Sequence, residues 1–256
     1  QGGSALNIVG GSWLYTSIRK MIQPMPMHSI AFIPDGNRRF AASQNLPLSA
    51  AYQLGTRRSW EVMEWLSDYP TIKVATFYTL SLENITRSAA ELTLLFDIFE
   101  READKILQEE TYKSGEFAIK FLGRLERFPS RLRAKMDRIQ EQSQDCAKRV
   151  INVAMGYNGR AEIVDAAKRI ARDAITNPAG LDALDEESFK NYLYSNFQDP
   201  DLVIRTGHTQ RMSGFLTYQS VYSELYFLNK FWPEFGKEDL RVAVDEFANR
   251  VRRFGK

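Results

Sequence analysis

Hydrophobic residues recur along the chain in two alternating patterns. Short apolar runs rich in β-branched residues predict strands at 29–33, 73–80, 117–122, 150–155, 201–205 and 224–228. Stretches with apolar residues at helical spacing lie between most of them, at about 49–68, 89–110, 129–147, 159–176, 186–194 and 237–252. Because parallel strands need long crossovers, this alternation predicts one α/β domain with a central, mostly parallel six-stranded sheet flanked by helices.

The first residues stand outside this alternation. Residues 1–12 are rich in Gly and Ser and predict a flexible segment, so we assign the folded domain to residues 13–256. Residues 13–23 have apolar positions near helical spacing beside Arg19 and Lys20, which fits either a docked helix or a membrane-interface anchor. No stretch approaches the ~20 apolar residues of a membrane span.

Polar side chains follow four of the predicted strands. Because parallel strands all end at one edge of a sheet, and ligands bind outside those carboxyl ends, we expect these side chains to meet. In chain order they are Asp35, Gly36, Asn37, Arg38 and Arg39; then Ser81, Glu83, Asn84 and Arg87; then Asn158 and Arg160; and finally Arg205, Arg211 and Ser213.

Such a set of side chains suits a phosphate or diphosphate group. Guanidinium forks bind phosphate oxygens bidentately, and the free N–H groups at a helix start add to them. A carboxylate among these cations, Asp35, is the ligand expected for Mg²⁺, which takes one or two carboxylates and completes its shell with phosphate and water. Glu224, at the head of the last strand, is a candidate second carboxylate.

Composition narrows the class of protein further. The formal net charge is only +2, which gives no global basic field for a nucleic acid. The single cysteine, Cys146, has no partner for an intramolecular disulfide, and no signal-peptide pattern opens the chain, so we expect a reducing, cytoplasmic compartment. The phosphate-binding loop, the dinucleotide glycine motif and zinc-ligand spacings do not occur.

An apolar cluster accompanies the polar one. The predicted helix 89–110 and the strand 117–122 carry bulky apolar side chains, namely Leu92, Leu94, Leu95, Phe96, Ile98, Phe99, Phe117, Ile119 and Phe121. Their spacing fits core packing, and beside a diphosphate site they would equally wall a tunnel for an apolar tail.

Several segments form a set of motifs in a fixed order. They read HSIAFIPDGNRRFA (28–41), YTLSLENITR (78–87), DPDLVIRTGHTQRMSGFLTYQSVYSELYF (199–227), FWPEFGKEDL (231–240) and FANRVRRFG (247–255). This set resembles the cis-prenyltransferases, the undecaprenyl diphosphate synthase-like enzymes. Arg38 stands where bacterial members have Gly, which favours the archaeal type.

The resemblance implies a fold and an activity. The fold would be a six-stranded parallel sheet with an elongated hydrophobic tunnel, in a homodimer paired through the C-terminal part. The activity would be Mg²⁺-dependent condensation of isopentenyl diphosphate with an allylic diphosphate primer, farnesyl or geranylgeranyl diphosphate, to a Z-polyprenyl diphosphate. Because that product is delivered to a bilayer, peripheral membrane contact is an open expectation, and no nucleic acid partner is expected.

The resemblance also implies roles for individual residues. Asp35 would hold Mg²⁺, with Glu224 as the second metal-binding carboxylate. The allylic diphosphate would be bound by Gly36, Asn37, Arg38, Arg39 and Arg87. The isopentenyl diphosphate would be bound by Arg205, Arg211 and Ser213, and by Arg253 and Gly255 of a C-terminal R-x-G that reaches into a partner's site. A closing loop would contain Ser81, Glu83 and Asn84. The proton lost from isopentenyl diphosphate would go to Asp35 or to a diphosphate oxygen positioned by Asn84.

The chain departs from the family pattern around both substrates. A Gly-His pair is replaced by Ala51-Tyr52, and an Arg upstream of it by Leu48. The Trp after Glu-Asn is Ile85, and in the last motif Glu and His are replaced by Thr209 and Gln210. Two alternatives follow: a prenyltransferase with a non-standard acceptor or non-head-to-tail coupling, and a non-catalytic subunit of a heteromeric transferase.

Overall fold

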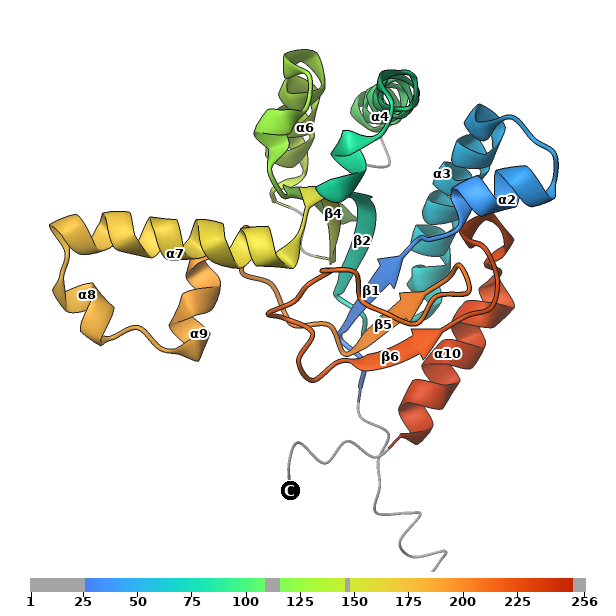
Figure 1. The fold of residues 1–256 in the computed structure, drawn as a ribbon. Coiled ribbons are helices and arrows are strands. Elements are labelled where there is room, and N and C mark those ends of the chain that lie inside the picture. The colour runs from blue at the N-terminus through green and yellow to red at the C-terminus, as the bar shows by residue number, and fades with distance from the viewer. Residues whose placement is uncertain (1–25, 109–115, 146–147, 251–256) are drawn as a thin grey trace, which may run out of the picture.

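The computed structural model describes residues 26–108, 116–145 and 148–250. Its six strands form one sheet in the order β3-β4-β2-β1-β5-β6, and every neighbouring pair is parallel (Figure 1). The strands are β1 (Ser29–Ile33), β2 (Val74–Ser81), β3 (Phe117–Leu122), β4 (Arg149–Tyr157), β5 (Leu202–Arg205) and β6 (Glu224–Phe227). The predicted six-stranded parallel sheet is therefore confirmed, and the predicted strand ends agree within two residues.

Helices connect these strands. They are α2 (Asn37–Ser43), α3 (Leu48–Trp65), α4 (Ala89–Gln108), α6 (Ser130–Ser143), α7 (Gly159–Thr176), α8 (Ala179–Asp182), α9 (Glu186–Phe189) and α10 (Lys237–Asn249). Five 3₁₀ turns complete the description: η1 (Leu66–Asp68), η2 (Glu83–Thr86), η3 (Leu125–Arg127), η4 (Lys190–Tyr192) and η5 (Trp232–Glu234). The pattern did not predict α2 or α8, because their 7 and 4 residues are too short to display a period of 3.6.

The two faces of the sheet pack against different partners. Along β1, Ile30 and Phe32 join the larger core beneath α3, α4, α6 and α10, whereas Ala31 and Ile33 join a smaller core with Phe215. This is the alternation expected of a strand buried on both faces. The larger core is the apolar layer in which a tunnel could form.

The β2–β4 pairing contains two irregularities. Tyr78 pairs with Ala154, but the next pairs are Leu80 with Met155 and Ser81 with Tyr157. Thr79 of β2 and Gly156 of β4 thus fall at the register shifts. Such bulges bend a strand and redirect its side chains, and here they lie where β2 leaves the sheet.

The helices α7, α8 and α9 form an arm that extends away from the sheet (Figure 1). Arg124, beyond β3, donates to Asp165 of α7 through Nε (2.9 Å) and Nη2 (3.0 Å), and the Tyr194 hydroxyl donates to the same carboxylate (2.6 Å). These bonds fasten the first half of α7 to the body.

Some predictions fall outside the described residues. They concern the flexible segment 1–12, the helix at 13–23, Cys146, and the C-terminal Arg253 and Gly255. None of the described helices is both long and apolar enough to cross a membrane.

Candidate active site

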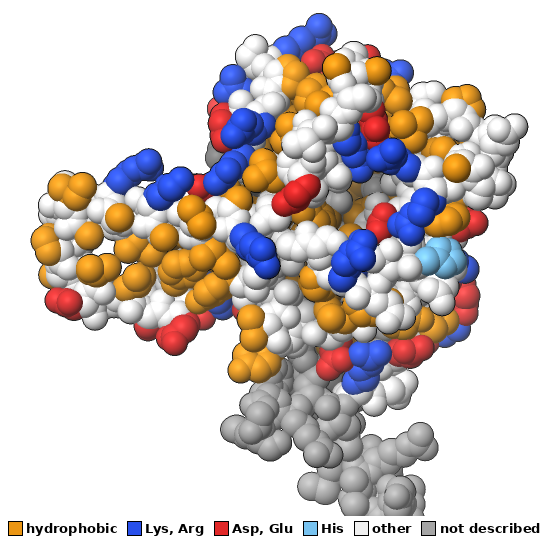
Figure 2. Space-filling view, viewed as in Figure 1, with side chains coloured by type: hydrophobic (Ala, Val, Ile, Leu, Met, Phe, Trp, Pro, Cys, Tyr) orange, Lys and Arg blue, Asp and Glu red, His pale blue; other side chains and the backbone are white. Residues whose placement is uncertain are grey.

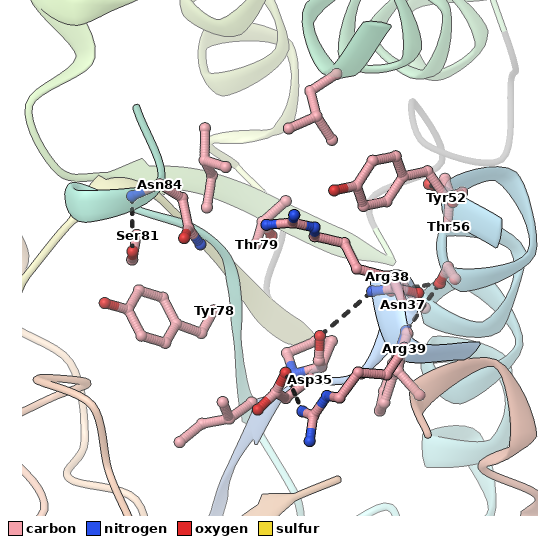
Figure 3. Close-up of a pocket in the computed structure, with 18 of the residues that line it drawn as sticks. Asp35, Asn37, Arg38, Arg39, Tyr52, Thr56, Tyr78, Thr79, Ser81 and Asn84 are labelled. Carbon is pink, nitrogen blue, oxygen red and sulfur yellow. Dashed lines mark hydrogen bonds and ion pairs between the residues drawn. The ribbon is translucent and has the colours of Figure 1, made fainter. Parts of the chain in front are cut away.

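The carboxyl ends of β1, β2 and β5 border a cavity of about 650 Å³, whose other walls come from α2, α3 and α4. Figure 3 shows side chains from these separate elements pointing toward one space. Ten of the predicted site residues line it: Asp35, Gly36, Asn37, Arg38, Arg39, Ser81, Asn84, Arg87, Arg205 and Ser213. The expectation that the polar groups after several strands meet at one edge is correct for these ten.

The backbone of Asp35 is held from several sides. Its N–H donates to the Ile33 carbonyl (2.8 Å) and to Thr206 Oγ1 (3.1 Å). Its carbonyl accepts from Thr206 Oγ1 (2.8 Å) and from the Trp232 N–H (3.0 Å). These bonds fix the acid at the edge of the sheet before its side chain makes any contact.

Gly36 makes the sharp turn from β1 into α2. Its φ is +107°, a conformation that side chains rarely adopt, and a Cβ there would lie 2.6 Å from Cδ1 of Phe231. The turn lets α2 start at once, so that Arg39 returns one helical turn after Asp35. Glycine is therefore required at this position by both its backbone conformation and its packing.

The Asp35 carboxylate is held between two guanidinium groups. Oδ1 accepts from Arg39 Nη2 at 2.9 Å (Figure 3). Oδ2 accepts from Arg205 Nη2 at 2.8 Å. Arg205 is buried, while Arg39 is half-exposed and lies over the Phe231 ring at 5.7 Å. One acid and two cations leave a net positive charge facing the cavity, which favours an anionic ligand.

Arg205 also ties the fifth strand to the loop that follows it. Nη1 donates to Ser213 Oγ (2.8 Å) and to the Arg211 carbonyl. Its Nε is buried and has no hydrogen-bond partner among the residues that the structure describes. A buried donor without an acceptor is costly, so this guanidinium retains donor capacity for an anion.

A second polar cluster lies between α3 and α4. Arg87 donates to the Tyr52 hydroxyl (2.9 Å) and to Glu91 (3.1 Å), and Tyr52 in turn donates to Glu91 (2.5 Å). Arg38 lies 3.9 Å from the same carboxylate. Burial, followed by the hydrogen bond to Glu91, raises the pKa of Tyr52 above its ordinary value. Tyr52 stays protonated and fixes the direction of Arg87.

The predicted closing loop is attached to the far side of the cavity. Ser81 Oγ accepts from the Asn84 N–H (3.1 Å), and Glu83 accepts from Asn158 Nδ2 (2.6 Å). Asn158 also caps α7 by accepting from the Arg160 N–H (2.8 Å). Ser81 and Asn84 line the cavity, whereas Glu83 points to the start of α7.

Two further predicted residues do not join this cluster within one copy of the chain. Glu224 opens β6 opposite Leu202, at the amino edge of the sheet, and its carboxylate accepts from Arg250 (2.7 Å). Arg211 contributes its carbonyl to Arg205, but its side chain is exposed and is not part of the cavity wall. Metal binding by Glu224 thus stays a prediction, because within one copy of the chain Glu224 does not reach the cavity that contains Asp35.

The residues present fit Mg²⁺ bound together with a diphosphate. Among the described residues, no three His, Cys, Asp or Glu side chains cluster into a metal site. Mg²⁺ needs only one or two carboxylates when phosphate oxygens and water complete its octahedron. Asp35 supplies one carboxylate on the cavity wall, and Arg205 supplies the unsatisfied donor beside it.

An apolar cavity of about 140 Å³ continues from the polar one. Thr56, Ser59, Thr79 and Phe99 line both. Its remaining wall is largely apolar and comes from β2, β3, β4, α3, α4 and α6. Some residues predicted to wall a tunnel line these cavities. The polar cavity is lined by Leu95, Ile98 and Phe99, and the apolar cavity by Phe99, Ile119 and Phe121. Three others, Leu94, Phe96 and Phe117, pack against the larger core.

Sequence reasoning missed two residues that shape the site. Thr206 clamps the Asp35 backbone, and Tyr78 lines the cavity while its hydroxyl donates to the carbonyls of Tyr157 (3.1 Å) and Ser213 (3.4 Å). Burial raises the pKa of Tyr78. The position of Thr206 directly after Arg205 is a signal that could have found it, but the register shift beside Tyr78 has no signature in the sequence.

Comparison with known proteins identifies the family. Residues 33–255 match the family model described as "Putative undecaprenyl diphosphate synthase". The chain belongs to this family. It is therefore a prenyltransferase, as the motifs predicted.

Individual relatives agree with this assignment. The chain is 40% identical to tritrans,polycis-undecaprenyl-diphosphate synthase (geranylgeranyl-diphosphate specific) of Thermoplasma volcanium, over 91% of this chain and 90% of that protein. It is 35% identical to isoprenyl transferase of Thermus thermophilus, over 95% of each. The crystal structure of lavandulyl diphosphate synthase from Lavandula x intermedia, in complex with dimethylallyl diphosphate, is similar with a TM-score of 0.85 and 29% identity, over 90% of this chain and 99% of that one.

Proposed function

We propose that this protein condenses isopentenyl diphosphate with an allylic diphosphate, geranylgeranyl diphosphate first among the candidates, to a Z-polyprenyl diphosphate. The observation that carries the proposal is Asp35, held between Arg39 and Arg205 in a polar cavity that continues into an apolar one. A substrate with a diphosphate head and an isoprenoid tail matches the two cavities in charge and polarity. The name of the Thermoplasma relative supports the choice of primer.

The polar cavity would bind the two diphosphates from different elements. Arg38 and Arg39 of α2, with Arg87, would hold the allylic diphosphate, while Arg205 and Ser213 would hold isopentenyl diphosphate. The isopentenyl double bond attacks the allylic carbon while the allylic C–O bond breaks and its electrons leave with the diphosphate. The proton that the isopentenyl unit then loses passes to Asp35 or to a diphosphate oxygen positioned by Asn84. Holding both substrates in one geometry removes much of the entropic cost of their encounter.

Asp35 is the proposed protein ligand for Mg²⁺. When bound, Mg²⁺ neutralises charge on the diphosphate leaving group. The chain's own contribution is the fixed backbone of Asp35 and the arginines that stabilise the same developing charge. Asn84 lies on the opposite wall, where it would position a substrate oxygen.

The decisive experiment measures incorporation of labelled isopentenyl diphosphate. Purified protein with Mg²⁺ should extend geranylgeranyl or farnesyl diphosphate, and EDTA should abolish the reaction. Asp35→Asn keeps the size of the side chain but removes its charge, and should lower kcat/KM by about 10²-fold or more. Asp97→Asn, an exposed residue of α4, is the matched control. Full activity of Asp35→Asn, or no incorporation with any primer, would refute the proposal.

A second candidate is coupling to an acceptor other than isopentenyl diphosphate. The likeness to lavandulyl diphosphate synthase favours it, as do the departures near the substrates. Of these departures, Tyr52 lies on the wall of the polar cavity. Leu48 is the first residue of α3, and Ile85 packs against the larger core. Thr209 and Gln210 lie in the loop after β5. Mass spectrometry of the products formed from dimethylallyl diphosphate alone distinguishes the candidates, because extension needs isopentenyl diphosphate and this coupling does not. The assembled Asp35, Arg39 and Arg205 weigh against the non-catalytic subunit.

We also propose that the protein acts as a homodimer. Exposed apolar side chains gather along the arm of α7, α8 and α9 (Figure 2), where Val164, Ile175 and Leu181 are 49%, 80% and 52% exposed. Val221 and Tyr222 are 71% and 65% exposed just before the edge strand β6. Apolar groups and an edge strand of this kind are suited to protein contact, and a second copy would cover them.

A further inference from the structure

Helices α3 and α4 are joined by two hydrogen bonds. The first is the Tyr52–Glu91 bond beside the polar cavity, and the second runs from Trp60 Nε1 to Glu102 Oε2 at 2.7 Å. At about 1.5 Å per residue, the second bond lies about 12 Å farther along α3 and about 16 Å farther along α4. Trp60 and Glu102 both line the apolar cavity and not the polar one.

Glu102 is unusual among the residues of that cavity because it carries a charge. Beside it the wall is formed by Met63, Ala103 and Ile106. Its second oxygen accepts from Lys105 Nζ at 2.8 Å, and the side chains of Glu102 and Lys105 are 18% and 60% exposed. The carboxylate therefore lies at the boundary between apolar cavity and solvent, with one oxygen bonded toward each side. The proposed chemistry at Asp35 uses neither Trp60 nor Glu102.

We propose that the Trp60–Glu102 bond is a latch that limits the length of the prenyl chain. The proposal rests on the proposed function, since it concerns the product of that reaction. A hydrocarbon that grows past this point must part α3 from α4 or displace Glu102. Either movement leaves the indole N–H and a carboxylate oxygen against hydrocarbon without their partners, which is unfavourable.

The other side chains of the wall offer less resistance. Met63 and Met136 are unbranched and change rotamer readily to fit a passing chain. Trp60 and Glu102 cannot yield in this way without breaking a bond to a charged group. The latch thus predicts that product length depends on a polar bond as well as on cavity size.

The test is the length distribution of products made from isopentenyl diphosphate and the best primer, read by mass spectrometry. Glu102→Leu keeps most of the volume but removes the charge and the bond, so its products should be longer by one or more isoprene units. Trp60→Phe removes the donor and keeps an aromatic ring, and should shift the products in the same direction. Lys105→Gln removes the outward partner only, so its products should match those of the unaltered chain.

Unchanged or shorter products from both Glu102→Leu and Trp60→Phe would overturn the latch while leaving the proposed function intact. A shift of equal size in Lys105→Gln would also overturn it, because surface charge would then be the cause. If the unaltered chain incorporates no isopentenyl diphosphate, the proposed function fails and the latch fails with it. Thermal unfolding checks each variant, and should Glu102→Leu not fold, the products of Trp60→Phe decide.

Discussion

At the scale of single residues, the site is a set of side chains whose direction is fixed by a neighbour. Arg87 is directed by Tyr52 and Glu91, and Arg205 by Ser213 and the Arg211 carbonyl. Long cationic side chains lose rotamer entropy when a ligand orders them. Fixing them beforehand reduces this loss, so the partners of each arginine should affect substrate affinity.

Tyr52→Phe tests this at one hydroxyl. The change removes the acceptor for Arg87 but leaves the Arg87–Glu91 pair, so we expect KM for the allylic diphosphate to rise about fivefold, equivalent to about 1 kcal/mol, with kcat nearly unchanged. Steady-state kinetics with a varied primer measures both constants. Tyr52→His, which restores the residue of the family motif, should recover part of the affinity. An unchanged KM, or an equal fall in kcat, would contradict a positioning role.

Single residues also show what could be predicted from the sequence. Asp35, Arg39 and Arg205 could be predicted because each lies at or shortly after the carboxyl end of a strand, and the topology of a parallel sheet brings such positions together. Glu224 is the predicted carboxylate at the head of the last strand. It is the first residue of β6 and therefore lies at the opposite edge of the sheet from the cavity. Tyr52 and Glu91 lie 39 positions apart in the chain, on two different helices, so no local sequence pattern specifies their contact.

At the scale of elements, the arm depends on a polar attachment at its base. Asp165 of α7 accepts from Arg124 of the body and from Tyr194 after η4. The Arg124 hydrogen bonds are the main cause that lowers the pKa of Asp165 below its usual value. The folded state therefore binds this proton less tightly than the unfolded chain does.

Asp165→Asn should weaken the attachment in a pH-dependent way. Because the folded pKa is depressed, the stabilisation is present above the unfolded pKa of about 3.9 and is lost as pH falls through the folded pKa. We expect the variant to lose about 1–2 kcal/mol of unfolding free energy at pH 7 and to approach the unaltered chain below about pH 4. Urea unfolding across this range measures the difference. Asp173→Asn, an exposed site on the same helix, serves as the control, and a pH-independent loss in Asp165→Asn would contradict the argument.

At the scale of the whole molecule, two features of the described residues suggest a second copy. The arm carries exposed apolar side chains, and Glu224 lies away from the cavity it was predicted to serve. A second copy would answer both, by covering the arm and by bringing residues of the amino edge near another copy's site. Activity would then require association.

The variant Ile175→Glu with Leu181→Glu tests this association. Two charges on the arm should shift the protein from dimer to monomer in light scattering at micromolar concentration, because burying an unpaired carboxylate in an interface is unfavourable. Specific activity should fall in parallel. Arg172→Glu, also an exposed change on α7, is the control for charge alone. A monomeric unaltered protein with full activity would refute the dimer.

The paired irregularities in β2 and β4 bear on how this family can diverge. Thr79 shifts the register in one direction and Gly156 shifts it back, so that Ser81 faces Tyr157 with the offset that Tyr78 had to Ala154. Deleting either residue alone would displace every later side chain of that strand to the opposite face. Insertions and deletions in these two strands should therefore be inherited together. A relative that lacked only one of the two irregularities would have the loop from Ser81 to Arg87 displaced relative to the cavity.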